Sequence, residues 1–189
     1  MYYQLKKPIK KKKYNKLVDF LIENSDSFLF NLPNMGKTVV NERNADVMDE
    51  PIGYVDEEDQ DEYMAYVEST KPCIDIIRDD IIESYFDTGC LDQITSIEHQ
   101  IFFAKISNKT KSFFMQTDSF SKWLFPYLPE DPCFIKNGKC IFQCISHEEL
   151  FFVDFDVPKV EEFLKKNRIR FFPMFGDATP LVYKAKNVL

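Results

Sequence analysis

Glycine is scarce in this chain, with five residues among 189, and no two of them lie closer than 17 positions apart. Average proteins contain about 7% glycine. A dinucleotide fingerprint or a complete phosphate loop needs several clustered glycines, because the backbone must approach the phosphate closely. Both kinds of nucleotide site are therefore excluded. At 44% apolar and 29% charged residues, the chain is expected to form one globular domain over residues 1–189 with a sizeable core.

Long apolar runs are also missing from the sequence. No run approaches the ~18 residues that a membrane-spanning helix requires. The N-terminus has no apolar segment of the kind found in signal peptides, since Pro8 and a run of lysines follow the first tyrosines. The five cysteines are odd in number, which favours reduced thiols. These absences predict a cytoplasmic protein with no membrane partner.

Basic residues are missing from residues 44–70, where ten carboxylates occur without a lysine or arginine. Residues 1–16 show the opposite pattern, with seven lysines and no acid. The net charge of −7 is therefore the sum of +7 in residues 1–16 and −14 in the acidic body of the protein, residues 17–189. An acidic body repels phosphate backbones and attracts basic proteins, so nucleic acid is not expected as a partner. The basic residues 1–12 are expected to form a disordered arm.

Hydrophobic periodicity predicts an α+β fold in which N-terminal helices precede a mostly antiparallel, aromatic-rich sheet packed by helices. The expected helices cover residues 13–24, 57–68, 72–89 and 157–167, with a short helix beginning at Asp118. The expected strands cover residues 28–30, 98–106, 112–117, 132–136, 139–146, 150–155 and 168–172. Asn137-Gly138 predicts a two-residue hairpin turn, because both residues tolerate positive φ. Residues 33–56 contain Pro33 and Gly36 and are predicted to form an irregular excursion, a loop without regular secondary structure, which ends the first strand.

Four pairs of adjacent phenylalanines fall in the expected strands, at residues 102–103, 113–114, 151–152 and 171–172. Neighbouring strand residues point to opposite faces of a sheet, so each pair places one ring on either side. Two interpretations follow. Either helices cover both faces of the sheet, or one face is partly open and docks a partner.

The cysteines and histidines leave a metal site or a nucleophilic site as an alternative to packing. In a regular Asn-Gly hairpin, Cys133, Cys140 and Cys144 would share one sheet face, and His147 could supply a fourth zinc ligand. Cysteine also behaves as a small buried hydrophobe, and only the spacing from Cys140 to Cys144 approximates a zinc knuckle. No cofactor or metal is therefore predicted.

The acid-dense segment around residue 60 is the best candidate for a partner-binding surface. Carboxylates there would face a basic protein, and neighbouring tyrosines would provide anchors within a charged rim. A solvated helix face is the alternative interpretation. The predicted partner-binding residues are Tyr54, Asp56, Glu57, Glu58, Asp59, Asp61, Glu62 and Tyr63.

One stretch of about 40 residues resembles a known pattern. Trp123 is followed by Leu128-Pro129-Glu130-Asp131, by Phe134, by the Asn137-Gly138 turn and by Ser146-His147-Glu148. This order is similar to that in small proteins of low-GC bacteria, several of which resemble the immunity proteins encoded beside polymorphic or contact-dependent toxins. The resemblance implies a cytoplasmic, non-enzymatic inhibitor, although the matching residues form turns and packing positions.

The leading hypothesis is therefore an immunity protein that neutralises a cognate toxin domain, for example a nuclease, by covering its surface or active site. A carboxylate-rich surface can occupy a basic substrate cleft in place of a phosphate backbone. The alternatives are a zinc-dependent or Cys/His-dependent hydrolase and a phage-associated or defence-associated regulator that binds another protein.

Overall fold

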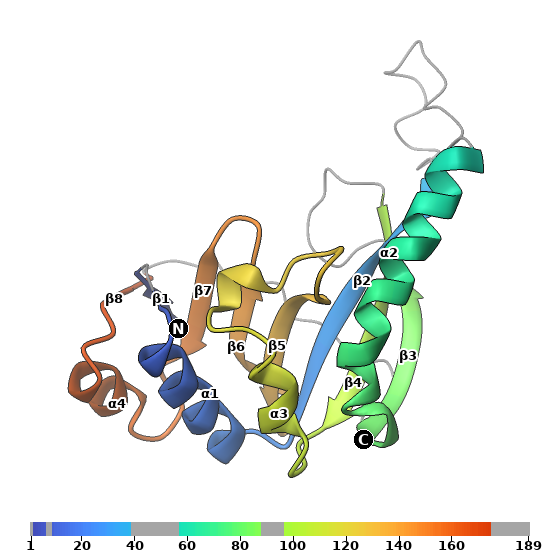
Figure 1. Cartoon of the computed structure of the whole chain (residues 1–189). Coiled ribbons are helices and arrows are strands. Elements are labelled where there is room, and N and C mark those ends of the chain that lie inside the picture. The colour runs from blue at the N-terminus through green and yellow to red at the C-terminus, as the bar shows by residue number, and fades with distance from the viewer. Residues whose placement is uncertain (1, 7–8, 39–56, 88–96, 175–189) are drawn as a thin grey trace.

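A computed structural model describes residues 2–6, 9–38, 57–87 and 97–174 of the chain. Its described part is α+β, with helices packed against an eight-stranded antiparallel sheet (Figure 1). The order of strands across the sheet is β3-β4-β2-β5-β6-β7-β1-β8. The predicted fold class is confirmed, but the predicted chain order is wrong, since two strands precede α2 and helices recur to the end.

The strands are β1 (Tyr2–Leu5), β2 (Ser27–Thr38), β3 (Ile81–Asp87), β4 (Ile97–Lys105), β5 (Glu130–Lys136), β6 (Lys139–Ile145), β7 (Leu150–Asp154) and β8 (Phe171–Pro173). The helices are α1 (Lys12–Asn24), α2 (Glu57–Asp75), α3 (Thr110–Phe114) and α4 (Val160–Lys166). Two 3₁₀ turns, η2 (Arg78–Asp80) and η3 (Phe120–Lys122), complete the described elements. Strands β5, β6 and β7 form the predicted meander.

One face of the sheet carries the main core, which we call the helix-side core. Every described helix contributes to it, and its largest fully buried side chains are aromatic. Trp123 Nε1 donates a hydrogen bond to Tyr14 Oη (3.0 Å), and that hydroxyl donates to the carbonyl of Phe114 (2.7 Å). The rings of Phe114 and Phe134 stack with centroids 4.8 Å apart. Sequence periodicity correctly placed α1 over this core, with Leu17 and Leu21 fully buried.

The other face carries a smaller strand-side cluster. Its members come from β2, β4, β5 and β6, and partly buried Tyr85 of β3 packs against them: Leu29, Ile101, Phe103, Cys133, Ile135 and Cys140. No described helix contributes a side chain to this cluster. The interpretation that helices cover both faces is therefore wrong for the described part of the chain.

The basic N-terminal segment is not a disordered arm. Tyr2–Leu5 form β1, which pairs with β7 on one side and with β8 on the other. Tyr2 and Leu5 are buried, so two apolar residues beside the lysines suffice to hold this segment in the sheet. Lys12 and Lys13 belong to α1.

The excursion predicted from residue 33 begins later than expected. β2 continues past Pro33 to Thr38, and residues 39–56 lie outside the described residues. Pro33 is tolerated because the pairing of β2 with β5 ends at Asn31, so at Pro33 only β4 lies alongside.

Two predictions confused strand with helix. The helix expected over residues 72–89 is wrong, since α2 runs through Pro72 to Asp75 and residues 81–87 form β3. Ile77, Ile81 and Tyr85 fit both a helical and a strand period, and pairing with β4 selects the strand. The strand expected over residues 112–117 is also wrong, because residues 110–114 form α3 and both rings of its phenylalanine pair join the helix-side core.

Candidate protein-docking surface

The acidic segment builds the first turns of α2. Six carboxylates and no base lie between residues 56 and 62, and negative charge there stabilises the positive end of the helix dipole. Glu57–Tyr63 lie in this helix, where the structure describes their backbone, whereas Tyr54 and Asp56 lie outside the described residues. The structure therefore places six of the eight predicted partner-binding residues together on two turns of one helix.

This half of α2 stands away from the helix-side core. Among the described side chains of α2, the buried ones are Thr70 and Cys73, close to its C-terminal end. Met64 is 49% exposed. In Figure 1 the Glu57 end of α2 projects beyond α1, α3 and α4, alongside the far end of β2. Within the described part of the chain, the acidic turns thus form the projecting end of α2.

One edge of the described sheet is formed by β3. Of the described strands only β4 pairs with β3, so its outer backbone edge meets no described strand. Ile82 and Phe86 are 61% and 53% exposed, an unusual pair of large apolar residues on an edge strand. Glu83 and Tyr85 alternate with them and pair with Phe103 and Ile101 of the strand-side cluster. Phe86 therefore points to the face that α2 covers, whereas Ile82 lies at a register shift between Ile81 and Glu83, where the regular alternation is interrupted.

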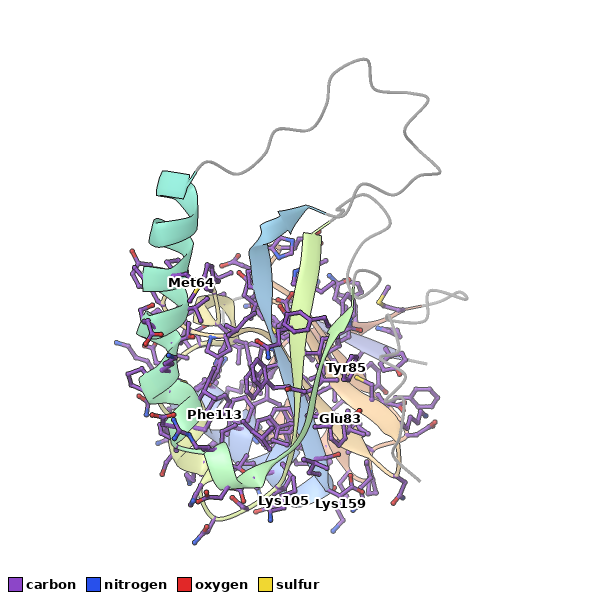
Figure 2. All side chains as sticks on the ribbon, turned by 90° about the vertical axis from the view of Figure 1, so that its right-hand side faces the viewer. Met64, Glu83, Tyr85, Lys105, Phe113 and Lys159 are labelled. Atoms are coloured by element: carbon purple, nitrogen blue, oxygen red, sulfur yellow. The ribbon has the colours of Figure 1, made fainter. Side chains whose placement is uncertain are left out.

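Met64 and Phe86 reach a similar level along the molecule. Helix α2 ends at Asp75, η2 connects it to β3, and β3 then runs back from Ile81 (Figure 2). At ~1.5 Å per helical residue and ~3.3 Å per strand residue, Met64 and Phe86 each lie about 16 Å from this connection. We call Met64, Ile82, Phe86 and the acidic turns of α2 the edge surface.

Ion pairs fix the connection between α2 and β3. Ser107 Oγ donates a hydrogen bond to Asp80, whose carboxylate is buried, and Lys105 Nζ lies 3.8 Å from the same carboxylate. Lys109 Nζ lies 2.7 Å from Asp79 and lowers the pKa of that carboxyl below its ordinary value. The two halves of the edge surface are thereby attached to the β4–α3 connection.

The cysteines do not assemble the zinc set considered from the sequence. A bulge in β6 shifts its register with β5, so that Cys133 faces Gln143. The bulge reverses the alternation of side chains. Cys133 and Cys140 consequently join the strand-side cluster, whereas Cys144 joins the helix-side core. The expectation that these three cysteines share one face is wrong.

The thiols that the structure describes, those of Cys73, Cys133, Cys140 and Cys144, are all buried. Burial raises the pKa of Cys73 to about 12 and holds the pKa values of Cys133 and Cys144 well above their ordinary range. A nucleophilic cysteine needs a lowered pKa. His147 lies exposed in the turn after β6. Within the described residues, no three His, Cys, Asp or Glu side chains converge on a point that could hold a metal ion.

Sequence reasoning missed a pair of perturbed carboxyls at the start of β5. Burial, reinforced by the charge of Asp131, raises the pKa of Glu130 to about 7, although Phe125 N–H donates to its carboxyl. Burial also raises the pKa of Asp131, which accepts a 2.6 Å hydrogen bond from Ser146 N–H. In the sequence, the Pro129-Glu130-Asp131 segment indicates only a turn. The Asp131 carboxyl connects β5 to the turn after β6, where the Ser146 hydroxyl also lies within hydrogen-bond reach of it. The Glu130 carboxyl accepts a hydrogen bond from the Phe125 N–H instead.

A second feature missed from the sequence is a broad hollow of about 1150 Å³ at the start of α1. Lys11, Lys12 and Lys122 line it together with Tyr127, which is 82% exposed. Asp118 in the same hollow is bound by Lys122 at 2.7 Å, and that hydrogen bond lowers its pKa. The hollow contains none of the predicted partner-binding residues, and its basic lining suits a different ligand from the one expected at α2.

Comparison with protein-family models, with curated proteins and with solved structures finds no match for this chain. None of the helices that the structure describes is both long and apolar enough to cross a membrane.

Proposed function

We propose that this protein is an immunity protein, which binds a cognate toxin domain and blocks it without catalysing a reaction. The observation that carries the proposal is the edge surface, which combines carboxylate-rich turns at the Glu57 end of α2 with exposed Ile82 and Phe86 on the edge strand that follows this helix. The resemblance of the stretch at about residues 111–156 to small bacterial proteins, several of which resemble immunity proteins, adds to it.

The edge surface combines three properties that suit a protein partner. A dense group of carboxylates accelerates association with a basic partner and suppresses wrong partners. Exposed apolar side chains such as Phe86 and Met64 provide anchors that become buried in the complex. The outer edge of β3 can pair with a strand of the partner through main-chain hydrogen bonds. A toxin that acts on nucleic acid has a basic cleft, which such a surface complements.

The test is co-production of the protein with the toxin domain encoded beside its gene, with cell growth as the readout. A variant with Glu57→Gln, Glu58→Gln and Glu62→Gln removes three charges from α2 and keeps residues that favour helix. A matched control, Glu23→Gln, Glu148→Gln and Glu162→Gln, removes three charges from other exposed positions. We expect the α2 variant to associate about tenfold more slowly at low salt and to protect poorly. The control should behave like the unaltered protein.

Two outcomes contradict the proposal. Equal loss of association in the two variants would show that only the overall charge matters and that the edge surface is not the interface. Failure of the unaltered chain to bind or protect against the adjacent toxin would remove the immunity function. Binding to a different cellular protein through the same residues would instead support a regulator.

A further inference from the structure

The hollow at the start of α1 is a separate feature from the edge surface. It has a volume of about 1150 Å³, and none of its lining residues belongs to α2 or β3. Three segments of the chain build its walls: the beginning of α1, the residues that follow α3, and η3 with the residues that follow it. In Figure 1, α3 lies between α1 and α2, and the Glu57 end of α2 projects away from the start of α1.

The hollow carries a net positive charge. Lys11, Lys12 and Lys122 line it together with one acid, Asp118. Asp118 binds Lys122 at 2.7 Å, so this pair is neutral. Lys11 and Lys12 are exposed, and neither forms a salt bridge with a residue that the structure describes. Two positive charges are therefore available to a ligand.

The helix that begins at the hollow adds to these charges. The first turn of α1 contains no acid, and no side chain caps its first N–H groups. The positive end of the helix dipole therefore reinforces Lys11 and Lys12. Helix α4 begins in the opposite way, since Glu161 and Glu162 lie in its first turn. Lysines at the start of α1 cost stability, and a bound anion would offset that cost.

Apolar side chains line the rest of the hollow. Met115 and Leu128 are half-buried and pack against the helix-side core, and Leu124 is half-buried as well. Tyr127 lines the same hollow and is 82% exposed. Tyrosine is a frequent anchor in interfaces, because its large ring becomes buried at a low cost in conformational entropy. The hollow thus offers an apolar contact beside its two unpaired lysines.

This combination suits an acidic peptide segment better than a small molecule or a nucleic acid. Small-molecule pockets enclose most of the surface of their ligand, whereas the lysines and Tyr127 of this hollow are exposed. A nucleic acid extends beyond the hollow and meets the acidic body of the protein, which repels its phosphates. A short segment stays within the hollow, close to Lys11 and Lys12.

We propose that this hollow binds a short acidic segment of a second protein. Carboxylates of the segment pair with Lys11 and Lys12, and an apolar side chain of the segment packs on Leu124 and Tyr127. The site goes beyond the proposed immunity function, because the edge surface suits a basic partner and shares no residue with the hollow. The protein can therefore hold two partners of opposite charge.

Titration of the full-length protein with synthetic peptides, followed by nuclear magnetic resonance, tests the site. The probe is a short peptide of glutamates with one phenylalanine at its centre. We expect chemical-shift changes at Thr117, Leu124 and Tyr127, which line the hollow. The affinity should fall severalfold as the salt concentration rises, because the lysines are exposed. A peptide with lysines in place of the glutamates should not bind.

Charge removal at the start of α1 gives the main variant. Lys11→Asn with Lys12→Gln removes both charges, and asparagine tolerates the positive φ of position 11 (49°). We expect the glutamate peptide to bind about tenfold more weakly. The matched control is Lys159→Asn with Lys166→Gln, because Lys159 also precedes a helix at positive φ (60°) and both lysines are exposed. The control should bind the peptide like the unaltered protein.

Tyr127→Ala tests the apolar contact. The fold should not change, because this side chain is 82% exposed. Binding of the peptide that contains phenylalanine should weaken about fivefold. Binding of a peptide of glutamates alone should stay the same. Equal affinity of the Tyr127→Ala variant and the unaltered protein for the first peptide would overturn the apolar contact.

Three outcomes would overturn the site itself. The first is an equal affinity of the Lys11/Lys12 variant and its control for the glutamate peptide. The second is the absence of shifts in the hollow of the unaltered protein at millimolar peptide, a measurement that stands if a variant does not fold. The third is tighter binding of inorganic phosphate or of a single-stranded oligonucleotide, which would assign the hollow to a small anion or to nucleic acid.

Discussion

The two faces of the sheet solve the same packing problem in different ways. The helix-side core gathers side chains from α1, α2, α3 and α4, and its buried hydroxyl, that of Tyr14, both accepts and donates a hydrogen bond. The strand-side cluster has six members from strands, and the buried amides of Asn31 and Gln143 on the same face have no described partners. The hydrophobic periodicity of a helix predicts which of its faces packs on the sheet, so the helical layer can be predicted from the sequence. The apolar residues of a strand predict that a face of the sheet is buried, but they do not identify the segment that covers it.

The largest expected effect is on the helix-side core. Phe114 contacts the rings of Phe28, Trp123 and Phe134 with centroid distances of 5.3, 5.1 and 4.8 Å. Phe114→Ala leaves a cavity among rings held by several elements and should cost about 4 kcal/mol of unfolding free energy. Phe103→Ala in the smaller cluster should cost less, about 3 kcal/mol. Urea unfolding measures the free energy of unfolding of both variants. An equal or larger loss for Phe103→Ala would contradict the expected difference between the helix-side core and the strand-side cluster.

A smaller effect on stability is expected at Glu130, which lies opposite Asn31 where β5 begins. Its pKa of about 7 in the folded protein lies above its ordinary value of 4.5, so folding favours the protonated carboxyl. The resulting stability is fully present below pH 4.5 and is lost as the pH rises through 7. Glu130→Gln should remove this loss and make the protein about 3 kcal/mol more stable than the unaltered chain above pH 7.

Unfolding free energies measured from pH 4 to pH 8 test this prediction, with Glu162→Gln as a control at an exposed position. A constant difference between the Glu130→Gln variant and the unaltered chain over that range would contradict a perturbed Glu130.

The next largest loss of stability is expected when the buried hydroxyl of Tyr14 is removed from the helix-side core. Tyr14→Phe removes the acceptor of the Trp123 N–H and the donor to the carbonyl of Phe114. Both groups are then buried without these partners, so the unfolding free energy should fall by about 1–2 kcal/mol. Denaturant unfolding measures the loss, and Tyr127→Phe at an 82% exposed position is the control. A change below the experimental error would show that this pair of bonds adds no stability.

The smallest effect on stability is expected at the edge surface. Ile82→Lys changes a side chain that is 61% exposed and should alter the unfolding free energy by less than about 0.5 kcal/mol. The same change removes an apolar anchor from the edge surface and adds a positive charge that repels a basic partner, so toxin binding should weaken at least tenfold. Calorimetric titration with the toxin domain measures this, and unchanged affinity would move the interface away from β3.

Much of the strand arrangement on the C-terminal side could be predicted from local signals. The alternation in residues 130–154 and the Asn137-Gly138 turn gave β5, β6 and β7 correctly, because hairpin pairing is local and turn chemistry is specific. The bulge that separates Cys144 from Cys133 has no such signal.

Segments whose state depends on distant partners could not be predicted. β1 is a strand only because β7 and β8 flank it, and residues 81–87 become β3 only beside β4. Of the predicted partner-binding set, the helical placement of Glu57–Tyr63 followed from their pattern. Exposed Ile82 and Phe86 were missed, because residues 72–89 were predicted as a helix. Asn31 and Gln143 carry a usable signal, since each interrupts an apolar strand.

The position of β1 also orders events during synthesis. β1 leaves the ribosome before every other described strand, yet its two neighbours are residues 152–154 and 171–173. Tyr2 and Leu5 therefore remain exposed or loosely associated until β7 and β8 have been synthesised, when almost all of the described chain has been made. The lysines that follow β1 keep this waiting segment hydrated and discourage it from pairing with the edge of another chain. The first described strand in the sequence is thus among the last to join the sheet.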